Sequence, residues 1–108
     1  MGSSRLVIRV HRCRVAPGVE GEFSKGIRDK AVPAARALPG IEYSAFGRRL
    51  EGQDHHFINV TIWHDYEQVR QQTGDSLDAR LIFDGEAQMI VEDSIEFYEV
   101  VGSDIDTD

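Results

Sequence analysis

A nine-residue stretch, "FINVTIWHD" at positions 57–65, constrains the fold more than any other part of the sequence. It reads as a β-strand, which sends successive side chains to opposite faces of a sheet. One face carries Ile58, Val60 and Ile62. The other face carries Asn59 and Trp63, whose N–H groups need hydrogen-bond partners if they are buried. Neither face suits solvent, so the sequence predicts a strand that is covered on both sides.

The residues before this stretch predict a strand followed by a helix. Residues 5–15, "RLVIRVHRCRV", alternate and are rich in β-branched side chains, which is typical of a strand. Residues 19–38 carry apolar side chains at three- and four-residue spacing, which predicts one amphipathic helix. Its apolar stripe consists of Val19, Phe23, Ile27, Ala31, Ala34 and Leu38. Pro33 is expected to kink or interrupt this helix near its C-terminal end.

Two further strands are predicted on either side of the turn cluster "EGQD". Residues 41–50 form one strand and residues 55–64 the other, so the two are expected to make a hairpin. Asp65 then stands where it can cap a helix, with Gln68 three residues on as its capping-box partner.

A less regular helical region is predicted to run from Tyr66 to about Glu92. "TGDS" interrupts it, and Asp75 or Ser76 is expected to start a fresh helix. The acidic residues toward its end are expected on a solvated helix surface without the clustered spacing of a metal site: Asp84, Glu86, Glu92 and Asp93. Residues 94–101, "SIEFYEVV", predict the last strand.

The predicted order is β-α-β-β-α-β. With right-handed crossovers it gives a ferredoxin-like α+β fold, a four-stranded antiparallel sheet with both helices on one face. The other face would be bare and apolar, which marks an association surface. We therefore expect a two-fold homodimer that stacks sheet against sheet. The 108 residues predict a single domain over 5–102, with flexible termini at 1–4 and 103–108.

Composition argues against several classes of partner. The net charge is −7 and no basic stripe is present, so neither nucleic acid nor an anionic membrane is expected to bind. No stretch of ~18 apolar residues predicts a membrane span. Cys13 is the one cysteine, so an intrachain disulfide is impossible. That fits a reducing compartment, and we expect a cytoplasmic protein.

The order of four segments resembles the antibiotic biosynthesis monooxygenase (ABM) family of dimeric α+β barrel proteins. The segments are "VAPG", "KAVPAARALPG", "GRRLEG" and "FINVTIWHDYEQ". The resemblance covers roughly residues 5–102 and implies the dimeric α+β barrel. The family and its superfamily include quinone-forming monooxygenases without prosthetic group or metal, haem-degrading oxygenases and many proteins of unknown function.

The resemblance implies roles for two residues of the third strand. In quinone-forming members an Asn and a Trp, four residues apart on that strand, face a cavity between sheet and helices. Asn59 and Trp63 match this spacing. Those members also use a Tyr and an Arg on or after the second helix. Tyr66 and Arg80 lie in that vicinity, but their spacings do not coincide with the family's.

Haem-degrading members offer a second comparison. They carry an Asn on the first strand, a Trp on the third and an axial His on the second helix. Trp63 matches again, whereas the first-strand position falls on His11. Residues 66–92 contain no His, which counts against haem held in the family's way. The resemblance therefore favours a protein without cofactor or metal.

The residues supply groups for a cofactor-free oxidation. Such a reaction needs a substrate that itself reduces oxygen, such as an electron-rich phenol or anthrone that has lost a proton. The protein must take the proton, hold the anion and keep the site dry. His11 is the candidate base, and the first and third strands of this fold are neighbours, so we expect it near Asn59. Asn59 is the candidate donor to the anion, and Trp63 either stacks on a flat ring or donates its N–H.

Three interpretations of function stay open. The first is a cofactor-independent monooxygenase that acts on a small aromatic, polyketide- or quinol-type substrate. The second is a non-catalytic dimeric barrel that binds a small ligand or is related to stress, which the uneven second helical region and the missing Tyr and Arg matches favour. In that case Trp63 is packing and His11 an ordinary strand histidine. The third is haem binding or degradation, which rests only on Trp63 and His11.

Overall fold

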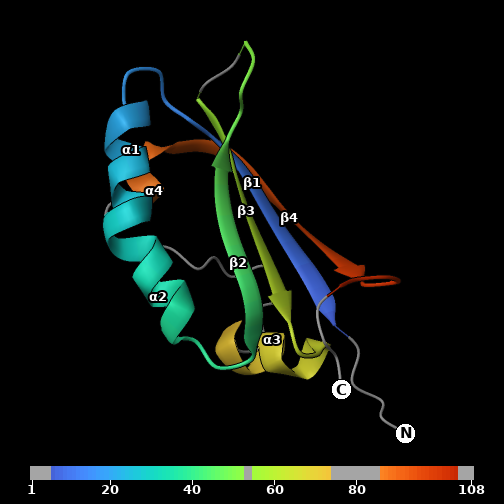
Figure 1. The fold of residues 1–108 in the computed structure, drawn as a ribbon. Helices are drawn as coiled ribbons and strands as arrows, with labels where there is room; N and C mark the ends of the chain where they lie inside the picture. The colour runs from blue at the N-terminus through green and yellow to red at the C-terminus, as the bar shows by residue number, and fades with distance from the viewer. Residues whose placement is uncertain (1–5, 53–54, 74–85, 105–108) are drawn as a thin grey trace, which may run out of the picture.

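A computed structural model describes residues 6–52, 55–73 and 86–104. One antiparallel sheet has the strand order β2-β3-β1-β4, with helices on one face (Figure 1). The strands are β1 (Val7–Val15), β2 (Ile41–Arg48), β3 (His56–Trp63) and β4 (Ile90–Glu99). The predicted ferredoxin-like α+β arrangement is confirmed. The predicted fresh start of a helix at Asp75 or Ser76 lies outside the described residues.

The first helical segment carries its irregularity next to the proline. A π-helical turn, η1 (Ile27–Ala31), joins α1 (Glu20–Gly26) to α2 (Val32–Ala37). Pro33 stands in the first turn of α2. A proline has no N–H, and its ring crowds the carbonyl one turn earlier, so the wider turn before it removes that conflict. The predicted interruption of this helix is confirmed.

The π turn also moves the apolar stripe of the helix. Phe23 and Ala31 are buried as predicted, but the next buried position is Ala35 and Ala34 is exposed. The predicted place of Ala34 in the stripe is therefore wrong, because one extra residue in the turn shifts the register of the helix after it. The resulting core cluster consists of Cys13, Val15, Phe23, Ala31, Phe57 and Met89.

Two contacts of Gln68 hold α3 (Tyr66–Thr73), the helix that follows β3, against the end of the sheet. The N–H of Gln68 donates to Asp65 Oδ1 at 2.9 Å, which confirms the predicted cap. The side chain of Gln68 lies against Gly40, where φ is +91° and a Cβ would lie only 2.7 Å from Gln68 Oε1. A larger residue at position 40 would therefore be excluded by both conformation and space.

The last strand begins earlier than predicted. The helix α4 (Glu86–Met89) is one turn long, and β4 starts directly after it at Ile90. The expectation that Glu92 and Asp93 lie on a helix surface is therefore wrong. Pairing with β1 decides the conformation, since Glu92 is the partner of Arg14 in the ladder and their side chains form an ion pair at 2.8 Å. Asp84 lies outside the described residues.

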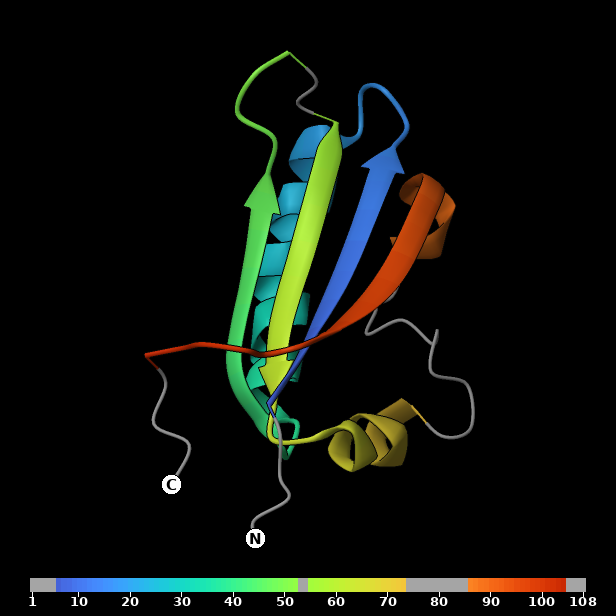
Figure 2. The same ribbon diagram turned by 90° about the vertical axis from the view of Figure 1, so that its right-hand side faces the viewer.

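The sheet has two different faces (Figures 1 and 2). Asn59 and Trp63 are buried on the face under the helices, as are Arg9 and His11. The opposite face, here called the open face, has no helix over it in Figure 2. Its middle consists of half-buried or exposed apolar residues with buried Val10 among them: Ile8, Val10, Tyr43, Ala45, Val60, Ile62 and Tyr98. Among the described residues, no helix is long and apolar enough to cross a membrane.

Replacing the capping carboxylate tests the start of α3. Asp65→Ala is expected to lower the free energy of unfolding by about 1 kcal/mol, because the N–H of Gln68 loses its acceptor. Chemical denaturation followed by circular dichroism measures this change. Asp65→Asn is the matched control, since asparagine caps a helix about as well as aspartate. Equal losses in the two variants would contradict the capping role.

Candidate functional site

The candidate site is built on one row of cross-strand neighbours. In the sheet register His11 of β1 stands between Asn59 of β3 and Ile95 of β4, and Asn59 has Phe46 of β2 on its other side. All four side chains point to the face under the helices, because pleated strands in register keep opposed residues on one face. The predicted proximity of His11 to Asn59 is therefore present.

His11 forms a close polar pair with Asp93, which the sequence had placed on a solvated helix surface. Its Nε2 lies 3.0 Å from Oδ2 of Asp93, which is on the neighbouring strand β4. The pair is well shielded, with His11 6% and Asp93 13% exposed. A neutral imidazole that donates to a carboxylate through Nε2 has Nδ1 as its basic nitrogen. Asp93 alternates with Ile95 and Phe97 along β4, and this pattern in the sequence could have placed it on the same face of the sheet as His11.

Asn59 is anchored at one of its two amide hydrogens. Its Nδ2 donates to the main-chain carbonyl of Ala45 on β2 at 3.1 Å. This bond fixes the amide plane while the residue stays 7% exposed. Its amide oxygen and second N–H make no hydrogen bond to any other described residue. The amide is thus held in place and retains capacity to bind a ligand atom.

A small cavity lies above the His11–Asn59 pair. Its volume is about 20 Å³, which is room for about one water molecule. It is lined by His11, Cys13, Phe23, Ile27, Phe46, Phe57, Ile58 and Asn59. Two polar side chains among apolar ones make this a polar niche within the core. In this conformation the niche has no room for an aromatic substrate.

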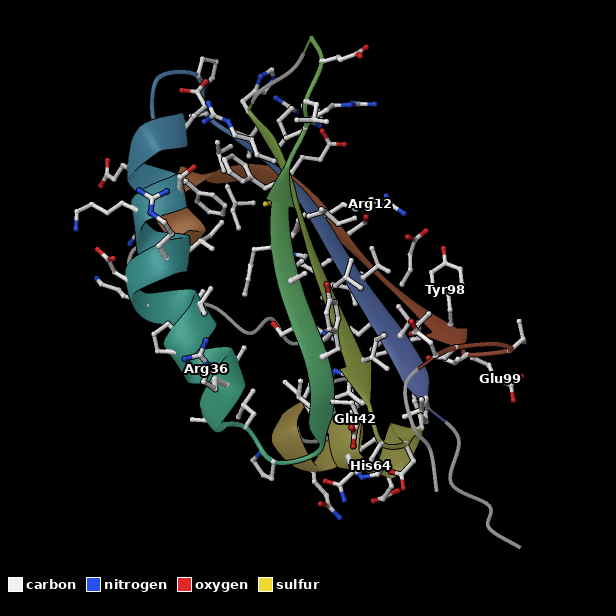
Figure 3. All side chains as sticks on the ribbon, in the orientation of Figure 1. Arg12, Arg36, Glu42, His64, Tyr98 and Glu99 are labelled. Atoms are coloured by element: carbon white, nitrogen blue, oxygen red, sulfur yellow. The ribbon has the colours of Figure 1, made fainter. Side chains whose placement is uncertain are left out.

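A much larger cleft lies next to this niche, between the helix and the edge strand β2. Its volume is about 500 Å³, within the usual range of small-molecule sites. The η1–α2 side contributes Ile27, Arg28, Val32, Ala35 and Arg36, and the β2 side contributes residues 41–46. Figure 3 shows Arg36 on α2, and Glu42 toward the start of β2. Ile27 and Phe46 line both the cleft and the niche, so these two side chains separate them.

Trp63 lies away from this niche. Four residues along a strand separate it from Asn59, a Cα separation of about 13 Å. Its side chain is fully buried, and its indole N–H donates to the Thr61 hydroxyl at 2.8 Å. Its neighbours in the ladder are Val7 and Ile41. The structure thus brings His11 and Asn59 together and places Trp63 apart from them, with its one donor occupied.

The other polar residues that the sequence singled out lie apart from this pair, where the structure describes them. Within the ranges that the structure describes, no three His, Cys, Asp or Glu side chains are grouped closely enough to hold a metal ion. His64 is exposed and pairs with Glu42 at 2.9 Å, which ties the end of β3 to the start of β2. Tyr66 packs its ring edge-on against Phe97 at 5.6 Å between centroids. Arg80 lies outside the described residues.

Comparison with known proteins places this geometry in a class defined by its fold. No protein-family model and no curated protein matches the sequence. Solved structures do match over nearly the whole chain. A protein from Nitrosomonas europaea, described as an antibiotic biosynthesis monooxygenase, has a TM-score of 0.72 at 11% identity, covering 94% of this chain and 95% of its own.

Two further structures link the fold to different chemistries. A variant of SnoaB, a cofactor-independent oxygenase from Streptomyces nogalater, has a TM-score of 0.68 at 17% identity, covering 92% of this chain and 96% of its own. The haem-degrading protein Rv3592 from Mycobacterium tuberculosis, in a haem-free form, has a TM-score of 0.65 at 21% identity, covering 94% and 97%. The resemblance to ABM proteins is confirmed at the level of the fold.

The buried bond between Trp63 and Thr61 can be tested by a change of nearly equal shape. Thr61→Val is expected to lower the free energy of unfolding by about 1–3 kcal/mol, because the indole N–H stays buried without its acceptor. Urea denaturation followed by the fluorescence of this single tryptophan measures the loss. Thr61→Ser keeps the hydroxyl and loses one methyl group, worth about 1 kcal/mol. Full stability of Thr61→Val would contradict the bond.

Proposed function

We propose that this protein is an ABM-type monooxygenase that oxidises a small aromatic substrate with molecular oxygen and without a cofactor. The observation that carries the proposal is the shielded His11–Asp93 pair beside the anchored amide of Asn59, next to a cleft of ligand size. A base, a donor and a binding space in one place are what proton abstraction from an acidic aromatic requires.

The substrate enters from the edge of β2 in this proposal. The cleft walls combine the aliphatic Ile27 and Val32 with the aromatic Phe46, a lining that suits a flat apolar ring. Phe46 is only half-buried, so turning its ring toward the cleft mouth would join the cleft to the niche. The ring of the substrate then takes the place of the phenyl group and faces His11 and Asn59.

His11 acts as the general base. Asp93 holds the proton of Nε2 and stabilises the imidazolium that forms when Nδ1 takes a proton from the substrate. The pair is a two-member version of the arrangement in which a buried carboxylate orients a catalytic histidine. Asn59 donates its second N–H to the substrate oxygen on which negative charge develops.

The oxidation then proceeds between the substrate anion and oxygen. The anion of an anthrone- or hydroquinone-type ring gives one electron to O₂, and the two radicals combine at carbon to form a C–O bond. Loss of water from the resulting hydroperoxide, with the proton returned by His11, leaves a carbonyl. One oxygen atom enters the product and the other leaves as water, so no external reductant is needed.

Trp63 has a packing role in this proposal. Its full burial, its bond to Thr61 and its place near the end of β3 support that assignment. The sequence-based role as a group that stacks on the substrate would require a second space beside it. The site residues that we propose are His11, Asn59 and Asp93, with Phe46 as the residue that separates cleft from niche.

We also propose that the protein is a homodimer joined through the open face. No helix lies over the apolar middle of this face in Figure 2, and the segment after β4 crosses in front of the lower part of the sheet. The segment after β4 extends on this side of the sheet, where Val101 is 95% exposed. A second copy on a two-fold axis would cover both, because each subunit presents the same surface.

The catalytic assignment is tested by oxygen uptake with an anthrone substrate. His11→Gln and Asn59→Leu are each expected to lower kcat/KM at least ~100-fold, since each removes a group that acts in the transition state. Asp93→Asn is expected to have a similar effect through His11. His64→Gln, a histidine on the sheet rim, is the matched control. Unchanged rates in His11→Gln would end the assignment of the base.

A second function is favoured by the closed state of the niche. Ile27 and Phe46 leave only about 20 Å³ beside His11, which suits a protein that binds a ligand in the outer cleft and performs no chemistry. Binding of an anthrone without oxygen uptake would support this function. A Soret shift on titration with haemin would instead indicate haem binding.

The dimer is tested by placing charge in the middle of the open face. Val60→Glu is expected to give monomers at micromolar concentration, because a carboxylate buried between two sheets lacks a partner. Size-exclusion chromatography with light scattering measures the mass. Leu50→Glu, at a residue 97% exposed in the β2–β3 connection, is the control and is expected to stay dimeric. A monomeric parent protein would contradict the proposal.

A further inference from the structure

The open face of the sheet changes character along its length. Its middle is apolar, but toward the β2–β3 connection two successive rows of cross-strand neighbours carry polar residues, among them Arg12 and Arg14. One row consists of Gly47, Ile58, Arg12 and Ser94, and the next contains His56, Arg14 and Glu92. Figure 3 shows Arg12 pointing away from the helices. We call this part of the face the basic basin.

The basin is hollowed to the size of a small-molecule site. Its volume is about 470 Å³. Gly47 and Ser94, at the two ends of one row, supply little or no side chain, whereas the arginines between and beside them are long. A Cβ at Gly47 would already approach Ile58 to 3.2 Å, so the floor is tightly packed there. Long cationic side chains thus stand around a low floor.

The charge of the basin is opposite to that of the whole chain. Arg12, Arg14 and Arg49 line it against Glu92, in a chain whose net charge is −7. Two further lining residues belong to the other face of the sheet: Arg48 opposes Phe57 in the ladder, with its guanidinium carbon 5.8 Å from the centre of that ring, and Asp93 opposes Cys13. Asp93 is bound to His11 on the other face. Local positive charge also acts on His56, whose pKa is lowered first by burial and then by the charges of His55, Arg49 and Arg14.

We propose that the basic basin binds a small molecule that carries a carboxylate or phosphate group. The planar guanidinium groups of Arg12 and Arg14 present paired N–H donors that match the geometry of these oxyanions. Their present partners are exposed carboxylates, Glu96 at 3.3 Å and Glu92 at 2.8 Å. Such exposed ion pairs are weak, so a multiply charged ligand replaces them with stronger contacts.

Two features limit the ligand to a small molecule. Glu92 and Glu96 stand beside the arginines on β4, so a nucleic-acid backbone that extended past the basin would meet like charge. The apolar rows begin directly after the basin, at Val10 and Val60, and these are the residues that the proposed dimer would cover. The basin therefore lies beside the proposed subunit interface, and its ligand is independent of the oxidation proposed for the other face.

Binding is tested by isothermal titration with two probes, inorganic pyrophosphate and citrate, at low ionic strength. Saturable binding of at least one probe is expected, and the stronger probe identifies phosphate or carboxylate as the preferred group. The double variant Arg12→Gln/Arg14→Gln is expected to bind the probe at least ~10-fold more weakly, because two charge-assisted contacts are lost. Arg28→Gln, an arginine of the other cleft, is the matched control. No saturable binding, or equal losses in both variants, would overturn the proposal.

A measurement on the unaltered protein avoids dependence on how the variants fold. In NMR spectra the probe is expected to shift the amide signals of Gly47, Ile58 and Ser94. It is also expected to raise the pKa of His56, because a bound anion favours the imidazolium. Shifts confined to other parts of the chain, with the titration of His56 unchanged, would refute the site.

Discussion

The pairing of β1 with β3 is the interaction on which the rest of the structure depends. It forms the centre of the sheet, and its register sets His11 against Asn59 and Val10 against Val60. The first pair faces the helices and the second faces the open side. A slip of one residue would exchange the two faces, burying the aliphatic row under the helices and exposing the polar one. The niche and the apolar middle of the open face thus both result from the register between β1 and β3.

The outer strands add groups that the central pair lacks. β4 brings Asp93 to His11, and β2 brings the carbonyl of Ala45 to Asn59 and the ring of Phe46 to the boundary of the cleft. The helix over this face completes the cleft, and its π turn next to Pro33 determines which helix residues face the sheet. Site and fold are therefore coupled through backbone register more than through any single side chain.

The sequence predicted the order of the elements well, because alternation and helical spacing are strong local signals. The cap at Asp65, the interruption near Pro33 and the nearness of His11 to Asn59 were all predicted. The start of β4 was not, since "MIVEDS" lacks a clean period and is decided by pairing with β1. Because the start of β4 was predicted too late, Asp93 was not recognised as a neighbour of His11. Ala35 is buried where the sequence predicted Ala34, because the π turn shifts the register of the helix. No local sequence pattern predicts that turn. The domain limits of 5–102 stay a prediction.

A structure of the protein with a bound aromatic ligand that cannot be oxidised would test the central claim most directly. We predict that the ring lies in the cleft between α2 and β2, that Phe46 has turned aside, and that a ligand oxygen lies within hydrogen-bonding distance of both His11 and Asn59. A ligand held only in the outer cleft, with Phe46 in place and the niche closed, would contradict a catalytic role for the His11–Asp93 pair.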